Sequence, residues 1–71
     1  MQMIEVFQTN VDSEDLAFQV IERLSLAMPM AEINFDLEDC DRILRIADIE
    51  VDIGLIYKVT SELGIFCEVL P

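Results

Sequence analysis

The 71-residue chain predicts a single α+β domain over residues 1–71, with four strands and two helices in the order βαββαβ. Residues 31–37 alternate apolar and polar side chains, which is typical of a half-buried strand. Two Val-Asp pairs, at 11–12 and 51–52, each precede an amphipathic stretch and predict the starts of two helices. The apolar positions around these pairs repeat, so the two halves of the chain share one order of elements.

In the first half, residues 3–9 are rich in β-branched and aromatic side chains and predict a strand. A helix is expected next, capped by Asp12 or Ser13. With Asp12 as the N-cap, Asp15 occupies the third helical position and forms an acidic variant of the capping box. The helix should end near Pro29, because the residue before a proline disfavours the helical conformation. Its expected apolar stripe consists of Leu16, Val20, Leu24 and Ala27 or Met28, and Ala17 and Ile21 widen it.

The first half closes with a strand at 31–37, which is expected to form a hairpin across the polar turn at 38–41 with residues 42–48, the first strand of the second half. Asp52 is placed to cap the second helix, and Gly64 to end it in a left-handed conformation. The apolar stripe of this helix is expected to contain Ile53, Ile56, Val59 and Leu63. Residues 65–70 alternate again and predict the closing strand.

Two split βαβ units with right-handed crossovers predict a four-stranded antiparallel sheet in the order 4-1-3-2, with both helices on one face. This arrangement is the ferredoxin-like sandwich. In that order the second and fourth strands are the two edges. Cys40 and Cys67 should therefore lie about three strand spacings, roughly 14 Å, apart, which is too far for a disulfide or a shared ion.

The composition argues against several classes of function. Fifteen carboxylates face four basic residues, which gives a net charge of -11. Such a charge repels phosphate backbones and anionic membrane surfaces, so we expect neither nucleic-acid nor membrane binding. The chain has no histidine, which excludes Ser-His-Asp and Cys-His catalysis, and a small sandwich offers little depth for a pocket. We therefore do not expect an enzyme, or a cofactor.

The location is expected to be cytoplasmic. The sequence shows neither an export signal nor an apolar run long enough to span a membrane. Both cysteines are then expected to remain reduced thiols, with Cys67 a small residue of the core and Cys40 exposed at the turn.

The chain resembles the heavy-metal-associated (HMA-like) domain of copper chaperones and metal-pumping ATPases over nearly all its length. Residues 20–24 are similar to that family's Ile-Glu-x-x-Leu stretch, and residues 29–35 to its turn and alternating second strand. Gly64-Ile65 is similar to the Gly-aromatic pair that opens the family's last strand. The resemblance implies the same βαββαβ fold.

The resemblance does not extend to the family's metal loop, in which a methionine precedes Cys-x-x-Cys. Val11 stands roughly at the position of the methionine, and Ser13 and Leu16 stand at the cysteines. A serine hydroxyl is a poor ligand for soft metals and leucine is none. We therefore expect a stand-alone, divergent member with a degenerate metal site.

An alternative metal site is offered by the acidic hairpin. It combines four carboxylates and one thiol, from Asp36, Glu38, Asp39, Cys40 and Asp41. Oxygen ligands of this kind suit hard cations, although the spacing is not that of an EF-hand. The competing interpretation is a solvated acidic turn that blunts an edge strand.

The open face of the sheet is the other candidate surface. If Ile4 and Val6 point toward the helices, the opposite face should present apolar side chains from Met3, Phe7, Ile43, Phe66 and Leu70. Such a patch suits an unknown protein partner or self-association into a homo-oligomer. We therefore predict a protein-interaction or self-associating module. Metal binding at the hairpin, or binding of a small effector near Asp12, are the alternatives.

Overall fold

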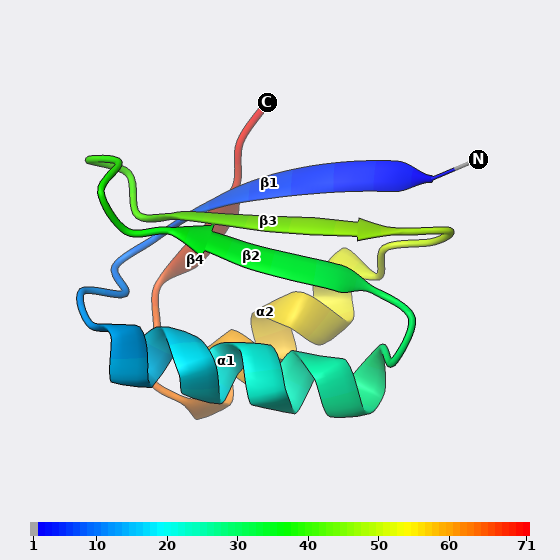
Figure 1. Ribbon diagram of the computed structural model, residues 1–71, viewed down its shortest axis with the longest axis horizontal. Coiled ribbons are helices and arrows are strands. Elements are labelled where there is room, and N and C mark those ends of the chain that lie inside the picture. The colour runs from blue at the N-terminus through cyan, green and yellow to red at the C-terminus, as the bar shows by residue number, and fades with distance from the viewer. Residues whose placement is uncertain (1) are drawn as a thin grey trace.

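The computed structural model describes residues 2–71 and contains the six elements in the predicted order. They are β1 (Met3–Thr9), α1 (Glu14–Ala27), β2 (Glu32–Asp36), β3 (Ile43–Asp48), α2 (Ile53–Glu62) and β4 (Cys67–Val69). The strands form one antiparallel sheet in the order β2-β3-β1-β4, which is the predicted order read from the other edge. Both helices lie against the same face of this sheet (Figure 1). The α+β class and this layer arrangement are confirmed.

Ser13, and not Asp12, is the N-cap of α1. Its backbone is extended (φ -139°, ψ 151°), and its hydroxyl oxygen accepts a hydrogen bond from the Leu16 N–H at 3.2 Å. The Asp12 capping box is therefore wrong by one residue. With the later start, Val11 is fully buried and Leu16 packs against the same core. The helix ends at Met28, directly before Pro29, as predicted.

The second helix begins and ends at the predicted residues. The carboxylate of Asp52 accepts a hydrogen bond from the Leu55 N–H at 3.1 Å, and Gly64 adopts a φ of 72° after the last turn. Thr60 is an unpredicted member of the buried face. Its hydroxyl donates to the Ile56 carbonyl oxygen at 2.9 Å, which satisfies a polar group that would otherwise be costly to bury.

The side chains of β1 point in the opposite directions from those predicted. Phe7 lies opposite Leu44 on β3 and Val69 on β4, and its side chain is fully buried beneath the helices. Ile4 is 59% exposed on the other face. The Phe7 ring meets the ring of Tyr57 on α2 edge to face, with centroids 6.2 Å apart. Phe7 thereby supplies a larger apolar side chain to the core than Ile4 or Val6 would.

The hydrophobic core lies between the sheet and the two helices. Its fully buried members include Val11, Val20, Leu24, Leu44, Ile46 and Ile56, together with Phe7. Within residues 2–71, neither helix has the length and apolar character needed to cross a bilayer.

Candidate functional site

The five side chains predicted for one interaction face do not lie together. Phe7 belongs to the core, which corrects its predicted place on the surface. Met3 lies on the helix-facing side of β1, at the end of the sheet, and is 44% exposed. Ile43 and Leu70 are half-buried at positions that alternate with the helix-facing residues, and exposed Phe66 precedes β4. The open face is therefore apolar through a different set, in which Ile4 and Val6 join Ile43 and Leu70.

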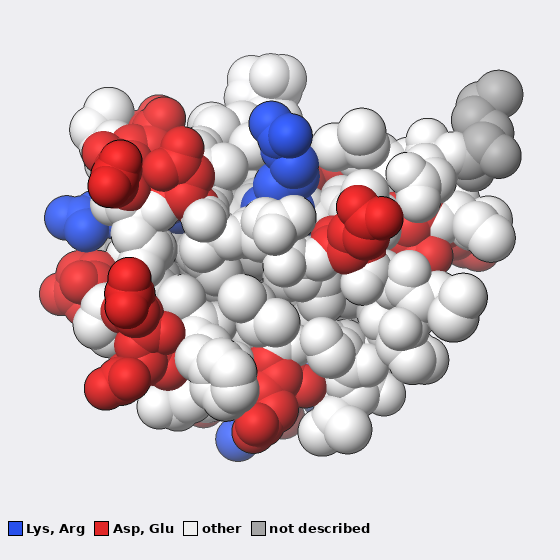
Figure 2. All heavy atoms as spheres, in the orientation of Figure 1, with Lys and Arg blue, Asp and Glu red and all other residues white. Residues whose placement is uncertain are grey.

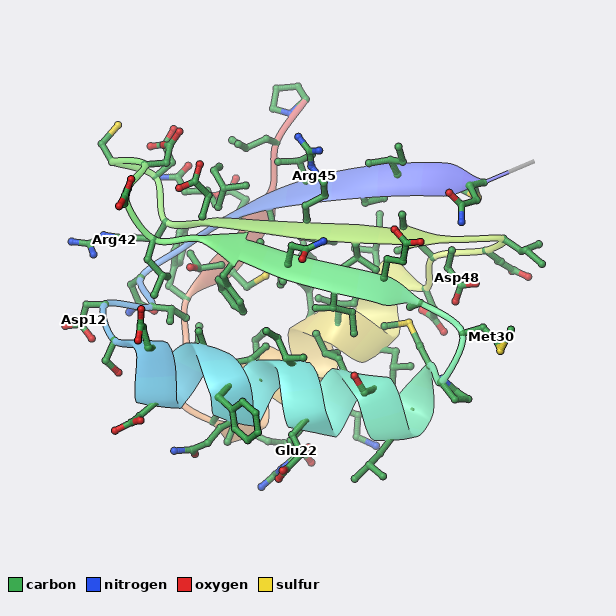
Figure 3. All side chains as sticks on the ribbon, viewed as in Figure 1. Asp12, Glu22, Met30, Arg42, Arg45 and Asp48 are labelled. Atoms are coloured by element: carbon green, nitrogen blue, oxygen red, sulfur yellow. The ribbon has the colours of Figure 1, made fainter. Side chains whose placement is uncertain are left out.

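The loop at which the resembled family holds its metal has a structural role in this chain. Val11 is fully buried, the Ser13 hydroxyl caps α1, and Leu16 packs against the core. Asp12 is exposed at the start of the helix (Figure 3). Val11, Ser13 and Leu16 thus supply a cap and apolar packing, and none of the four side chains is a thiol.

The hairpin brings together three of the five predicted alternative ligands. Potential ligand atoms of Asp39, Cys40 and Asp41 all lie within 4.8 Å of one another. The same residues build the turn, because the Asp39 carboxylate accepts the Asp41 N–H at 2.9 Å and the Asp39 carbonyl accepts the Arg42 N–H at 3.0 Å. Arg42 closes the turn with a φ of 48°. Asp36 and Glu38 instead line a groove beside the turn.

The two cysteines differ in their surroundings. Cys40 is exposed on the turn, and Cys67 is half-buried opposite Thr9 on the helix-facing side of β4. Burial raises the pKa of the Cys67 thiol from 9.0 to about 11, and a hydrogen bond with Thr60 acts weakly in the opposite direction. Cys67 therefore stays a protonated core thiol near neutral pH.

A groove of about 520 Å³ runs between α1 and the outer edge of β2. Its apolar lining combines one face of the helix with the inward side of the strand, through Ala17, Phe18, Ile21, Ile33, Phe35 and Leu37. Phe18 is 64% exposed, although it is a large aromatic side chain. The volume is within the range of binding clefts, and the walls come from two rigid elements. Figure 1 shows β2 at the front of the sheet with α1 beneath it.

Carboxylates surround this groove. Asn34 and three carboxylates complete its lining: Glu14 at the start of α1, and Asp36 and Glu38 at the end of β2. No Lys or Arg contributes to it. Figure 2 shows the same face, with acidic side chains around a largely uncharged area between the sheet and α1. The groove therefore combines an apolar floor with a negative rim.

Backbone hydrogen bonds show toward which neighbouring strand the N–H and C=O groups of each β1 residue point. The Leu70 N–H donates to the Val6 carbonyl at 2.8 Å, so Val6 bonds toward β4. The Thr9 N–H donates at 3.0 Å to the Asp41 carbonyl, in the turn that leads into β3, so Thr9 bonds toward β3. Because these directions alternate along an antiparallel strand, Phe7 bonds toward β3, where Leu44 is its partner.

The same alternation identifies the free groups of β2. Since Leu44 bonds toward β1, its neighbour Arg45 bonds toward β2, where it lies opposite Asn34. Asn34 is thus bonded within the sheet. The N–H and C=O groups of the residues on either side, Ile33 and Phe35, point outward from the edge. Within residues 2–71, no strand pairs with this edge.

The other edge of the sheet is short, and α2 bonds to one of its outward groups. β4 has three residues, and the N–H of Val69 donates to the hydroxyl oxygen of Tyr57 at 3.0 Å. β2 is therefore the available edge of this sheet, and the apolar groove lies directly beside it.

Sequence reasoning did not identify this groove. Ile21 widened the expected apolar stripe of α1, but Phe18 lies outside that stripe and was assigned no role. A large aromatic residue on the solvent side of an amphipathic helix is the one local signal that was present.

No family model, curated protein or solved structure matches this chain. Its function is therefore argued from the groove, the strand edge and the charge distribution.

Proposed function

We propose that this chain is a ferredoxin-like protein-interaction module that binds another protein in the groove between α1 and β2. The exposed apolar lining, with Phe18 64% exposed beside an available strand edge, carries the proposal. Large apolar side chains concentrated at one surface groove are typical of sites that bind partners. The strand order and the placement of both helices on one face support the ferredoxin-like description.

The resemblance to heavy-metal-associated domains is part of the same proposal. The element order fits that family, while Val11, Ser13 and Leu16 occupy the metal loop with apolar packing and a helix cap. On this interpretation the module retains the family's scaffold and acts through protein contacts. A cytoplasmic location fits its two free cysteines.

The composition favours binding to a protein over catalysis or nucleic-acid binding. The chain lacks histidine, and its net charge of -11 opposes phosphate backbones. Carboxylates on the rim of the groove add to that field locally, so the expected partner is a protein surface with apolar and basic character.

Site-specific cross-linking tests this function. A photoreactive phenylalanine at position 18 should form an adduct with a partner protein, and one at position 26 should not. Leu26 is the matched control, because it lies on the same helix, is 82% exposed and is not part of the groove lining. With the purified partner, Phe18→Ser should weaken binding by about tenfold or more, as for a truncated anchor residue. Equal effects of Phe18→Ser and Leu26→Ser would refute the groove as the binding site.

Self-association through the open face of the sheet is a second candidate. Ile4 is 59% exposed there, with Val6, Ile43 and Leu70 at neighbouring positions of the same face. The repulsion between two chains of charge -11 opposes it. Sedimentation over a range of concentrations tests this candidate. A dimer that Ile4→Ser dissociates supports it, and a monomer at every concentration refutes it.

A further inference from the structure

We propose that the partner contributes an extended segment that pairs with the outer edge of β2 as a fifth strand, and that this segment alternates apolar and basic residues. This inference rests on the proposed function and specifies the chemistry of the partner. It follows from three observations: the outward backbone groups of β2, the apolar groove beneath them, and the carboxylates on the other side of the same strand.

The backbone of β2 provides the first part of the recognition. The N–H and C=O groups of Ile33 and Phe35 point away from the sheet, as the register across β1 and β3 requires. Asn34, which lies between them, bonds to Arg45 on β3. An added strand would lie about 4.8 Å beyond β2 and would bond to both outward residues. Such pairing depends on the backbone and fixes the direction of every side chain on the incoming segment.

The groove specifies apolar residues on one side of that segment. Side chains that share the face of Ile33 and Phe35 would point toward the helix layer, where Phe18 and Ile21 line the groove. Burial of such side chains against Phe18 would remove its exposed ring from water. Every second residue of the partner segment is therefore expected to be apolar.

Charge specifies the residues between them. The side chains of Glu32 and Asp36 alternate with the inward residues of β2 and are exposed on the open face. Cross-strand neighbours of opposite charge stabilise a sheet, and like charges destabilise it. Lysine or arginine is therefore expected at the positions of the partner segment beside Glu32 and Asp36.

A second copy of the same chain does not fit this edge. Pairing β2 with another β2 would place the carboxylates of Glu32 and Asp36 beside those of the other copy. It would also bring together two chains that each carry a charge of -11. Acidic side chains on an edge strand are a known means of preventing edge-to-edge association of identical chains. The occupant is therefore a different, basic segment.

The test uses a short synthetic peptide of alternating valine and lysine, with both ends blocked. It is titrated into the isotopically labelled protein at low salt and followed by NMR. The peptide should bind, should shift the amide signals of Ile33 and Phe35, and should slow hydrogen exchange at both. A peptide with glutamate in place of lysine should not bind. Phe18→Ser should weaken binding by about tenfold, and Leu26→Ser should leave it unchanged.

Backbone N-methylation provides a control that electrostatic attraction alone cannot mimic. One peptide is methylated at every valine amide and another at every lysine amide, so that each has one blocked edge. Since an added strand bonds to β2 through one edge, one of the two peptides should lose binding and the other should retain it. Equal behaviour of the two would overturn the pairing of strands.

The outcome for this inference is separable from that for the proposed function. A partner that cross-links at position 18 but leaves the Ile33 and Phe35 amides unprotected would retain the groove as a binding site and overturn the added strand. Peptide binding that persists in Phe18→Ser, with no change in affinity, would count against both.

Discussion

Replacement of Phe7 tests the direction of β1, on which the assignment of both sheet faces depends. Phe7 is fully buried and meets Tyr57 edge to face, so Phe7→Ala should lower the free energy of unfolding by about 3–5 kcal/mol. A domain of 71 residues has about 4–11 kcal/mol in total. The variant should therefore lose a large part of its stability. Phe7→Leu, which keeps most of the apolar volume, should cost about 1–2 kcal/mol.

Ile4→Ala is the matched control, on the same strand but the opposite face. Ile4 is 59% exposed, so its truncation should cost less than about 1 kcal/mol. Urea unfolding followed by circular dichroism gives these differences from the transition midpoints. The direction predicted from sequence, with Ile4 inward and Phe7 outward, requires the opposite ranking. A larger loss for Ile4→Ala than for Phe7→Ala would refute the observed register.

Four further perturbations have expected outcomes. Gly64→Ala should cost about 1 kcal/mol in urea unfolding because φ is 72° there, while Gly54→Ala inside α2 should be neutral or stabilising. At mildly alkaline pH a thiol reagent should modify the exposed Cys40 before Cys67. Because burial raises the Cys67 pKa from 9.0 to about 11, Cys67 should react about 100-fold more slowly than a thiol whose pKa is 9.0. Because the unfolded chain ionises Cys67 first, stability should fall as pH rises from 9 toward 11, and less so in Cys67→Ala. Zinc or calcium should leave Tm unchanged; a rise that Cys40→Ser abolishes would establish the hairpin as a metal site.

The order of the elements could be predicted because it depends on local signals. The Asp52 cap, the left-handed Gly64 and the stop before Pro29 each follow from the conformational preference of one residue type. The N-cap of α1 was ambiguous by one residue because Asp12 and Ser13 are both good caps. Burial of Val11 distinguishes them, and burial is a tertiary property.

The direction of β1 could not be read from its own sequence. Ile4 and Val6 form one alternating set of this strand, and Phe7 and Thr9 belong to the other. Burial of the second set also places Glu5 on the helix-facing side. The sheet tolerates Glu5 there because β4 pairs only with Phe7–Thr9, so Glu5 lies where the sheet has narrowed and remains partly exposed. The extent of a neighbouring strand decides the matter, and no local pattern encodes it.

The same limit applies to the groove, and it explains how the acidic residues of β2 could serve two purposes. One interpretation of the acidic hairpin was that it blunts an edge strand, and the structure places β2 at an edge. The sequence does not indicate that the exposed ring of Phe18 lies beside that edge, because this depends on how α1 packs under the sheet. Carboxylates beside an available backbone edge repel another copy of this chain and attract a basic strand. An edge that only needed protection would not require an apolar groove next to it, so the combination favours selective pairing with a partner over simple blocking of the edge.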